Sequence, residues 1–142
     1  MVLLIDSNVI LDVLQMRNPH YETSYEIFRM CYHKKVTGYI SNLTFANIVY
    51  IMRKQLNGKK ITETLESLSE LFSFVNLKKL DFENAAKLEW KDFEDSIQYV
   101  TAERLKTDYI ITRNVKDFQL SEIPVITPEE FLSKMQNESI TF

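Results

Sequence analysis

The sequence predicts an α/β domain of three layers, in which helices cover both faces of a five-stranded parallel sheet. Three observations indicate this fold class. Short apolar runs, typical of buried strands, alternate with segments of helical periodicity along the 142 residues. Glycine and proline are rare, at 2 and 3 residues, which argues against a loop-rich β-sandwich. The length suits one domain, which we expect to span residues 1–135, followed by a flexible tail at 136–142.

The first strand is predicted at residues 3–5, a continuous apolar run of the kind found in strands buried on both faces. Asp6 follows directly and can cap a helix through its side chain. Apolar residues then recur at helical spacing as far as Leu14, and Pro19 ends the segment.

The next helix is predicted at residues 21–35 from its spacing of aromatic residues. Tyr25, Phe28 and Tyr32 fall on one face of this helix. Together with Tyr21, they are expected in the core and not as platforms on which nucleic-acid bases stack.

The later elements are bounded by residues that start or stop regular structure. Gly58 stops a helix that begins at Ser41. Asp81 and Asp92 are each placed to cap a helix, and Pro128 suits the first turn of the last helix. The predicted strands are 38–40, 74–77, 109–112 and 124–126, and the predicted helices are 41–55, 61–72, 81–90, 92–106 and 128–135.

Composition narrows the possible functions. Cys31 is the single cysteine and cannot form an internal disulfide, and 2 histidines are too few for a histidine–cysteine metal site. Any metal would therefore be held by carboxylates. No apolar run approaches the roughly 20 residues that span a bilayer, and the first run lacks the flanks of a signal peptide. We expect a cytoplasmic protein without membrane contact. The net charge of −3 argues against a large duplex-binding surface but not against a nuclease with an acidic pocket.

Polar residues follow the strands of the predicted sheet or open the helix that leads into one. In a parallel sheet, ligands collect beyond the carboxyl ends of the strands, where the strand order reverses. Several carboxylates at one place repel one another unless a divalent cation such as Mg²⁺ or Mn²⁺, which prefers oxygen ligands, neutralises them. The residues expected near this edge are Asp6, Asp92, Glu94, Asp95, Asn114 and Asp117.

Each carboxylate also has a purely structural interpretation. Asp6 can act only as a helix cap. Asp92 and Asp95 stand in a first helical turn, where acids favour the helix dipole without any further function. Glu94 lies away from the expected core face and is then solvated, and Asp117 is then a loop carboxylate.

Other charged residues have similar alternatives. Asp12 is expected on the helix surface or in support of the acidic site. The basic residues at 53, 54, 59 and 60 are expected on a solvated face, or where a phosphate backbone rests.

Nearly the whole chain resembles the PIN domain family. Any one of its segments is weakly specific, but several in order at the family's spacing are a strong signal. The matching segments are 4–12 (LIDSNVILD), 40–41 with 47–54 (NIVYIMRK), 92–98 (DFEDSIQ), 110–114 with 116–118 (IITRN and KDF) and 124–132 (PVITPEEFL).

The resemblance implies a sheet of strand order 3-2-1-4-5 and an endoribonuclease dependent on Mg²⁺ or Mn²⁺. Asp6 matches the family's first acid and Asp95 its third. Asn47 stands where the second acid is usual, and Asn114 where the fourth motif often has an aspartate, with Asp117 three residues on. Many relatives are toxins of bacterial toxin–antitoxin pairs, so an antitoxin partner and a homodimer are also expected.

On this reading Asp6, Asp95 and Asp117 are the catalytic metal ligands, and Asn114 or Asn47 completes the shell. The residues expected to orient these ligands or bind phosphate are Ser7, Asn8, Asp92, Glu94, Thr112 and Arg113. Lys116 is expected, with Arg113, to contact the RNA backbone.

Two alternatives remain open from the sequence. Because asparagine is neutral and a weaker metal ligand, Asn47 can instead mark a catalytically weakened protein that binds RNA or another protein. A phosphatase or a DNA nuclease is the other possibility.

Overall fold

The computed structural model describes residues 1–140, and a five-stranded sheet runs through its centre. The order of the strands is β3-β2-β1-β4-β5, and all four neighbouring pairs are parallel. Both the sheet and the order implied by the family resemblance are therefore confirmed. The strands are β1 (Val2–Ile5), β2 (Thr37–Ser41), β3 (Ser73–Val75), β4 (Tyr109–Ile111) and β5 (Val125–Ile126).

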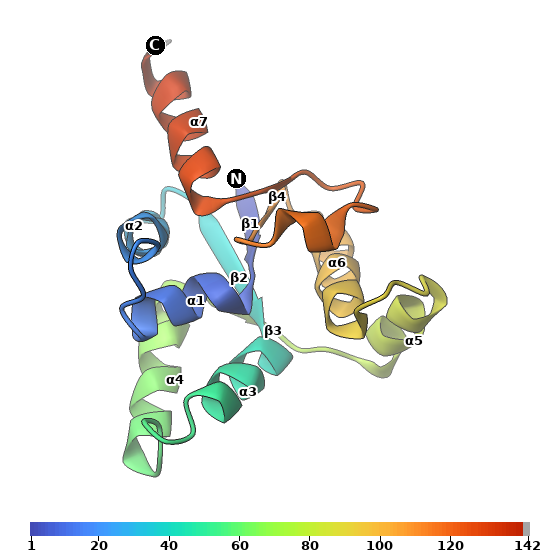
Figure 1. Cartoon of the computed structure of the whole chain (residues 1–142), viewed down its shortest axis with the longest axis horizontal. Helices are drawn as coiled ribbons and strands as arrows, with labels where there is room; N and C mark the ends of the chain where they lie inside the picture. The colour runs from blue at the N-terminus through green and yellow to red at the C-terminus, as the bar shows by residue number, and fades with distance from the viewer. Residues whose placement is uncertain (141–142) are drawn as a thin grey trace.

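Helices lie on both sides of this sheet, which confirms the three-layer architecture. In Figure 1, α1, α2, α4 and α7 lie on one side of the strands, and α5 and α6 lie on the other. The helices are α1 (Ser7–Leu14), α2 (Tyr21–Tyr32), α3 (Asn42–Ile51), α4 (Lys59–Leu71), α5 (Lys79–Lys87), α6 (Phe93–Leu105) and α7 (Pro128–Ile140), with a 3₁₀ turn η1 (Val115–Phe118). None of the helices within residues 1–140 has the length and hydrophobicity that a membrane crossing requires.

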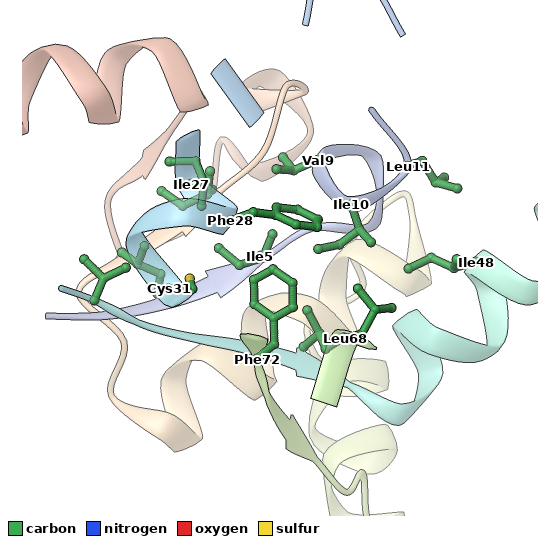
Figure 2. Packing of buried hydrophobic residues seen from close by; sticks show 14 of the residues in the cluster. Ile5, Val9, Ile10, Leu11, Ile27, Phe28, Cys31, Ile48, Leu68 and Phe72 are labelled. Atoms are coloured by element: carbon green, nitrogen blue, oxygen red, sulfur yellow. The ribbon is translucent and has the colours of Figure 1, made fainter. Parts of the chain in front are cut away.

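Alternating residues of the central strands fill two separate cores. Leu3 and Ile5 of β1 belong to the larger cluster, which packs under α1 and α2, and Figure 2 shows its labelled members converging between these elements. In this cluster the rings of Phe28 and Phe72 meet edge to face, with centroids 5.0 Å apart. Leu4 belongs to the smaller cluster on the α6 side. A strand buried on both faces explains the continuous apolar run at residues 3–5.

The core prediction for the aromatic face of α2 was wrong for two residues. Phe28 is buried, but Tyr25 is 43% exposed and Tyr32 is 64% exposed. The face of α2 that packs inward carries Ile27, Phe28 and Cys31, with Ser24 one turn earlier. The two tyrosines stand beside this face and not within it.

Asp81 does not cap α5 in the predicted way. The helix begins earlier, at Lys79, so Asp81 lies inside the first turn, where its carboxylate accepts the Lys78 backbone N–H at 2.8 Å. Arg104 of α6 donates to both carboxylate oxygens at 2.9 Å. This long-range pair places Asp81 at the contact between α5 and α6.

The ends of four helices also differ from the prediction, and two of them, α2 at Tyr32 and α5 at Lys87, come three residues early. Helix α3 stops at Ile51, short of residue 55, and α7 continues past residue 135 to Ile140. Residues 136–140 contain neither glycine nor proline, which would end a helix. The last two residues of the predicted tail, 141 and 142, lie outside the described residues.

Candidate functional site

The site lies where the strand order reverses, between β1 and β4. Asp6 directly follows β1 and Thr112 directly follows β4, and the Asp6 backbone N–H donates to the Ile111 carbonyl at 3.0 Å. The first turn of α6 brings Asp95 to the same region, and η1 brings Asp117. The carboxyl-end rule for parallel sheets thus predicts the place where these polar residues meet.

Asp6 is 8% exposed, and four donors fix its carboxylate. Oδ1 accepts the backbone N–H of Ser7 at 2.8 Å, which also caps α1. Oδ2 accepts the Thr112 hydroxyl at 2.8 Å and the Asn8 side-chain amide at 3.3 Å. Asn8 and Thr112 also bond to each other at 3.2 Å. Ser7, Asn8 and Thr112 therefore all contact Asp6, as the sequence suggested.

Gln98 is the fourth donor to Asp6, and the sequence analysis did not identify it as a site residue. Its Nε2 donates to Asp6 Oδ1 at 3.2 Å and to the Thr44 hydroxyl at 3.3 Å. Its Oε1 is buried and has no hydrogen-bond partner among the described residues. The signal was present in the spacing, because residue 98 follows Asp95 by one helical turn on the same face of α6.

Burial and neighbouring carboxylates raise the pKa of some of the acids at this site. Burial raises the pKa of Asp6 despite its hydrogen bonds. Burial, Asp92 and Asp6 together raise the pKa of Asp95 to about 7, with further contributions from Asp117 and Glu94. The ion pairs formed within residues 1–140 involve none of these five acids. Their negative charge is therefore not compensated by a basic side chain.

Asn47 and Glu94 form a direct contact between α3 and α6. The Asn47 side-chain amide donates to Glu94 Oε1 at 2.6 Å. Burial, and then Asp6 and Asp92, raise the pKa of Glu94 although the side chain is largely exposed. A carboxylate from α6 thus stands beside the position where the family usually has an acid on α3.

The other predicted site residues lie around this group. Asp92 caps α6 by accepting the Asp95 backbone N–H at 3.1 Å, which confirms that it acts as a helix cap. This role does not exclude that Asp92 also lies close to the other acids. Asp117 is exposed in η1. Asn114 is exposed as well, and its backbone N–H donates to the Thr112 hydroxyl at 3.1 Å.

Asp12 is fully buried, so the expectation that it lies on the helix surface was wrong. Its Oδ2 accepts Arg113 Nε at 2.7 Å and the Ser24 hydroxyl at 3.5 Å, and Arg17 lies 4.0 Å from Oδ1. An aspartate can be buried here because two arginines neutralise it. The pair also holds Arg113 in place directly after Thr112.

A cavity of about 630 Å³ opens beside the acids, and Asp92, Asp95 and Asp117 form part of its lining. A volume of this size lies within the usual range of ligand pockets. A molecule in this cavity is within reach of the carboxylates.

The donor set fits a hard divalent cation by its chemistry. It offers carboxylate oxygens with uncompensated charge and a buried amide oxygen of Gln98 without a partner. Within residues 1–140, however, no three acidic, histidine or cysteine side chains are grouped closely enough to hold an ion by themselves. Mg²⁺ commonly uses one or two carboxylates and completes its shell with water and substrate phosphate.

Comparison with known proteins agrees with this architecture. A family model described as PIN domain matches residues 2–116. The curated protein Ribonuclease VapC1 of Aquifex aeolicus (strain VF5) is 27% identical over 135 residues, which cover 92% of each chain.

Solved structures show the same fold. A toxin–antitoxin complex from Klebsiella pneumoniae contains a chain that matches 88% of this one with 26% identity and a TM-score of 0.66, over 96% of its own length. VapBC-1 from nontypeable Haemophilus influenzae matches 91% with a TM-score of 0.67, over 99% of its own length, at 17% identity, and so supports the fold alone.

Proposed function

This chain belongs to the PIN domain family, and from that premise we propose that it is a metal-dependent endoribonuclease that hydrolyses RNA phosphodiester bonds. The observation that carries the proposal is the group of uncompensated carboxylates around Asp6, at the strand-order reversal. The ribonuclease name of the Aquifex aeolicus relative supports RNA as the substrate.

In this proposal Asp6, Asp95 and Asp117 are the principal ligands of Mg²⁺ or Mn²⁺. Asn114 and Gln98 Oε1 are further oxygen donors within the same region. A bound divalent ion would lower the pKa of a water molecule and stabilise charge on the scissile phosphate. Thr112 and Asn8 both donate to Asp6 Oδ2 and hold the carboxylate in one orientation.

Glu94 supplies the acid that is missing at position 47. Asn47 cannot carry charge, but it donates to Glu94 and positions that carboxylate among the others. The total number of acids at the site is then kept, although one acid comes from a different helix.

The biological setting that we propose is a toxin–antitoxin pair. Support comes from the resemblance and from the similarity to a chain of a toxin–antitoxin complex from Klebsiella pneumoniae. We further propose a homodimer. The exposed tyrosines of α2, Tyr25 and Tyr32, belong to a surface that can meet a protein partner.

One observation favours a second function. The neutral Asn47 is what a catalytically weakened protein would carry, and such a protein would bind RNA without cleaving it. The contact of Asn47 with Glu94 favours the active enzyme over this alternative.

Cleavage of a labelled single-stranded RNA tests the proposal. We expect cleavage with Mn²⁺ or Mg²⁺, none with a chelator, and little cleavage of DNA of the same sequence. Asp95→Asn should lower the rate at least 100-fold, whereas Asp108→Asn, at the opposite end of β4, should leave it unchanged. Equal rates for wild type and Asp95→Asn would contradict the proposal. Preferential cleavage of DNA would show that DNA, and not RNA, is the substrate.

A further inference from the structure

The cavity beside the acids has a second set of lining residues that the proposed chemistry does not use. Besides the aspartates, it is lined by Trp90, Lys91, Lys116, Gln119 and Leu120. This set combines an aromatic ring, an apolar side chain, an amide and two ammonium groups. The same combination recognises a nucleotide, because a base needs a flat apolar contact and a phosphate needs positive charge.

Trp90 is held in a fixed orientation at the cavity. Its ring stacks on Tyr99 with centroids 4.9 Å apart and planes at 28°, and it meets Phe118 edge to face at 6.4 Å. The indole nevertheless remains partly exposed. Leu120 is 72% exposed, so its apolar surface is open to a ligand in the cavity.

The two lysines provide charge that no carboxylate of the described chain takes up. Lys91 and Lys116 are exposed, and none of the ion pairs found within residues 1–140 includes them. Lys116 precedes Asp117, and Lys91 precedes Asp92, so each positive charge is adjacent in sequence to an acid of the site. A phosphate bound by either lysine would therefore lie next to the acidic cluster.

We propose that this cavity binds one unpaired nucleotide of the RNA substrate, with its base against Trp90 and Leu120 and its flanking phosphates near Lys91 and Lys116. The inference rests on the proposed function and names its substrate class as single-stranded RNA. A base inside a duplex is paired and stacked, so it cannot enter a cavity unless it leaves the helix. Gln119 offers a donor and an acceptor to the edge of the base.

Trp90 makes the proposal measurable without catalysis, because it is the only tryptophan of the chain. We would titrate the protein with a single-stranded oligoribonucleotide in the presence of a chelator and follow tryptophan emission. A stacked base should quench the emission saturably, and a duplex of the same sequence should not. Unchanged emission with single-stranded RNA, or equal quenching by the duplex, would overturn the proposal.

Charge variants test the two lysines in the same titration. Lys116→Met should weaken RNA binding severalfold and reduce the slope of log affinity against log salt by about 1. Lys35→Met is the matched control, because this exposed lysine precedes β2 at the other end of the sheet. Equal effects of both substitutions would mean that the cavity is not the binding place.

The outcome separates this inference from the proposed function. Quenching without cleavage in Mn²⁺ would support the cavity and contradict the nuclease. Cleavage without quenching would support the nuclease and contradict the cavity.

Discussion

Asp95 stands in the first turn of α6 with a pKa raised to about 7, first by burial and then by the charges of Asp92 and Asp6. Its ordinary pKa is 3.8, so the folded state binds more protons than the unfolded state between these two values. Stability from this group is present at low pH and is lost as pH rises towards 7. The ionised Asp95 carboxylate should therefore lower the free energy of unfolding of the metal-free protein at pH 8.

Replacing this one charge should stabilise the metal-free protein at high pH. Asp95→Asn should raise the melting temperature at pH 8, in chelator, by about 3 °C, the shift that roughly 1 kcal/mol gives in a domain of this size. At pH 4 the gain should disappear, because the wild-type carboxyl is then protonated. Thermal unfolding at both pH values measures this, with Asp108→Asn as the control. A lower melting temperature for Asp95→Asn at pH 8 would contradict the repulsion described above.

The contact between Asn47 and Glu94 predicts that an acid can be moved between α3 and α6. Glu94→Gln should weaken Mn²⁺ binding about tenfold or more, which corresponds to about 1.4 kcal/mol. Adding Asn47→Asp to this variant should restore most of the affinity, because one carboxylate again stands at the contact. Calorimetric titration of the wild type and of the single and double variants checks this. Failure of the double variant to recover would show that Glu94 has no such role.

Single residues were predicted where the sheet alone determines their place. Asp6 and Thr112 follow adjacent parallel strands, so the sequence was enough to bring them together. The contact between Asn47 and Glu94 depends on how α3 and α6 pack against each other, and no local pattern records that packing. Asp12 was misplaced for the same reason, since its partner Arg113 is distant in sequence.

At the scale of elements, α2, β2 and α4 meet at Gly38. A Cβ atom added there would lie 2.8 Å from the Cys31 sulfur of α2 and 2.9 Å from Phe72, the residue that follows α4. Both distances are shorter than any ordinary contact, so the strand can approach the two helices only because residue 38 lacks a side chain.

Gly38→Ala should therefore destabilise the protein by about 1–3 kcal/mol, the usual cost of overpacking a core. Denaturant unfolding measures the loss. The double variant Cys31→Ala with Gly38→Ala should recover part of it, because the sulfur atom is removed. If Gly38→Ala unfolds at the same denaturant concentration as the wild type, the three elements do not pack as closely as described.

The kinds and order of the strands and α-helices were predictable because apolar periodicity and caps are local signals. Every predicted strand and helix is present, and the main differences lie at helix ends, where α3 ends early and α7 ends late. The 3₁₀ turn η1 was not predicted, because four residues are too few to show a period. The ion pair between Asp81 and Arg104 could not be predicted from local signals, because the two residues lie on different helices.

At the scale of the whole molecule, the sheet separates two cores and leaves the acids at one end, outside both. Acidic repulsion can accumulate there because the cores stabilise the fold independently of the site. A ligand that neutralises the acids binds only the folded chain, so it should also stabilise that chain. Binding of a divalent ion thus connects the proposed function with stability.

The most direct test is calorimetric titration of Mn²⁺ into the wild type and into Asp6→Asn, with cleavage of single-stranded RNA followed in parallel. We predict that the wild type binds the ion and cleaves, and that both properties disappear together in Asp6→Asn while its unfolding remains cooperative. Asp6→Asn that binds Mn²⁺ and cleaves RNA as the wild type does would contradict the account.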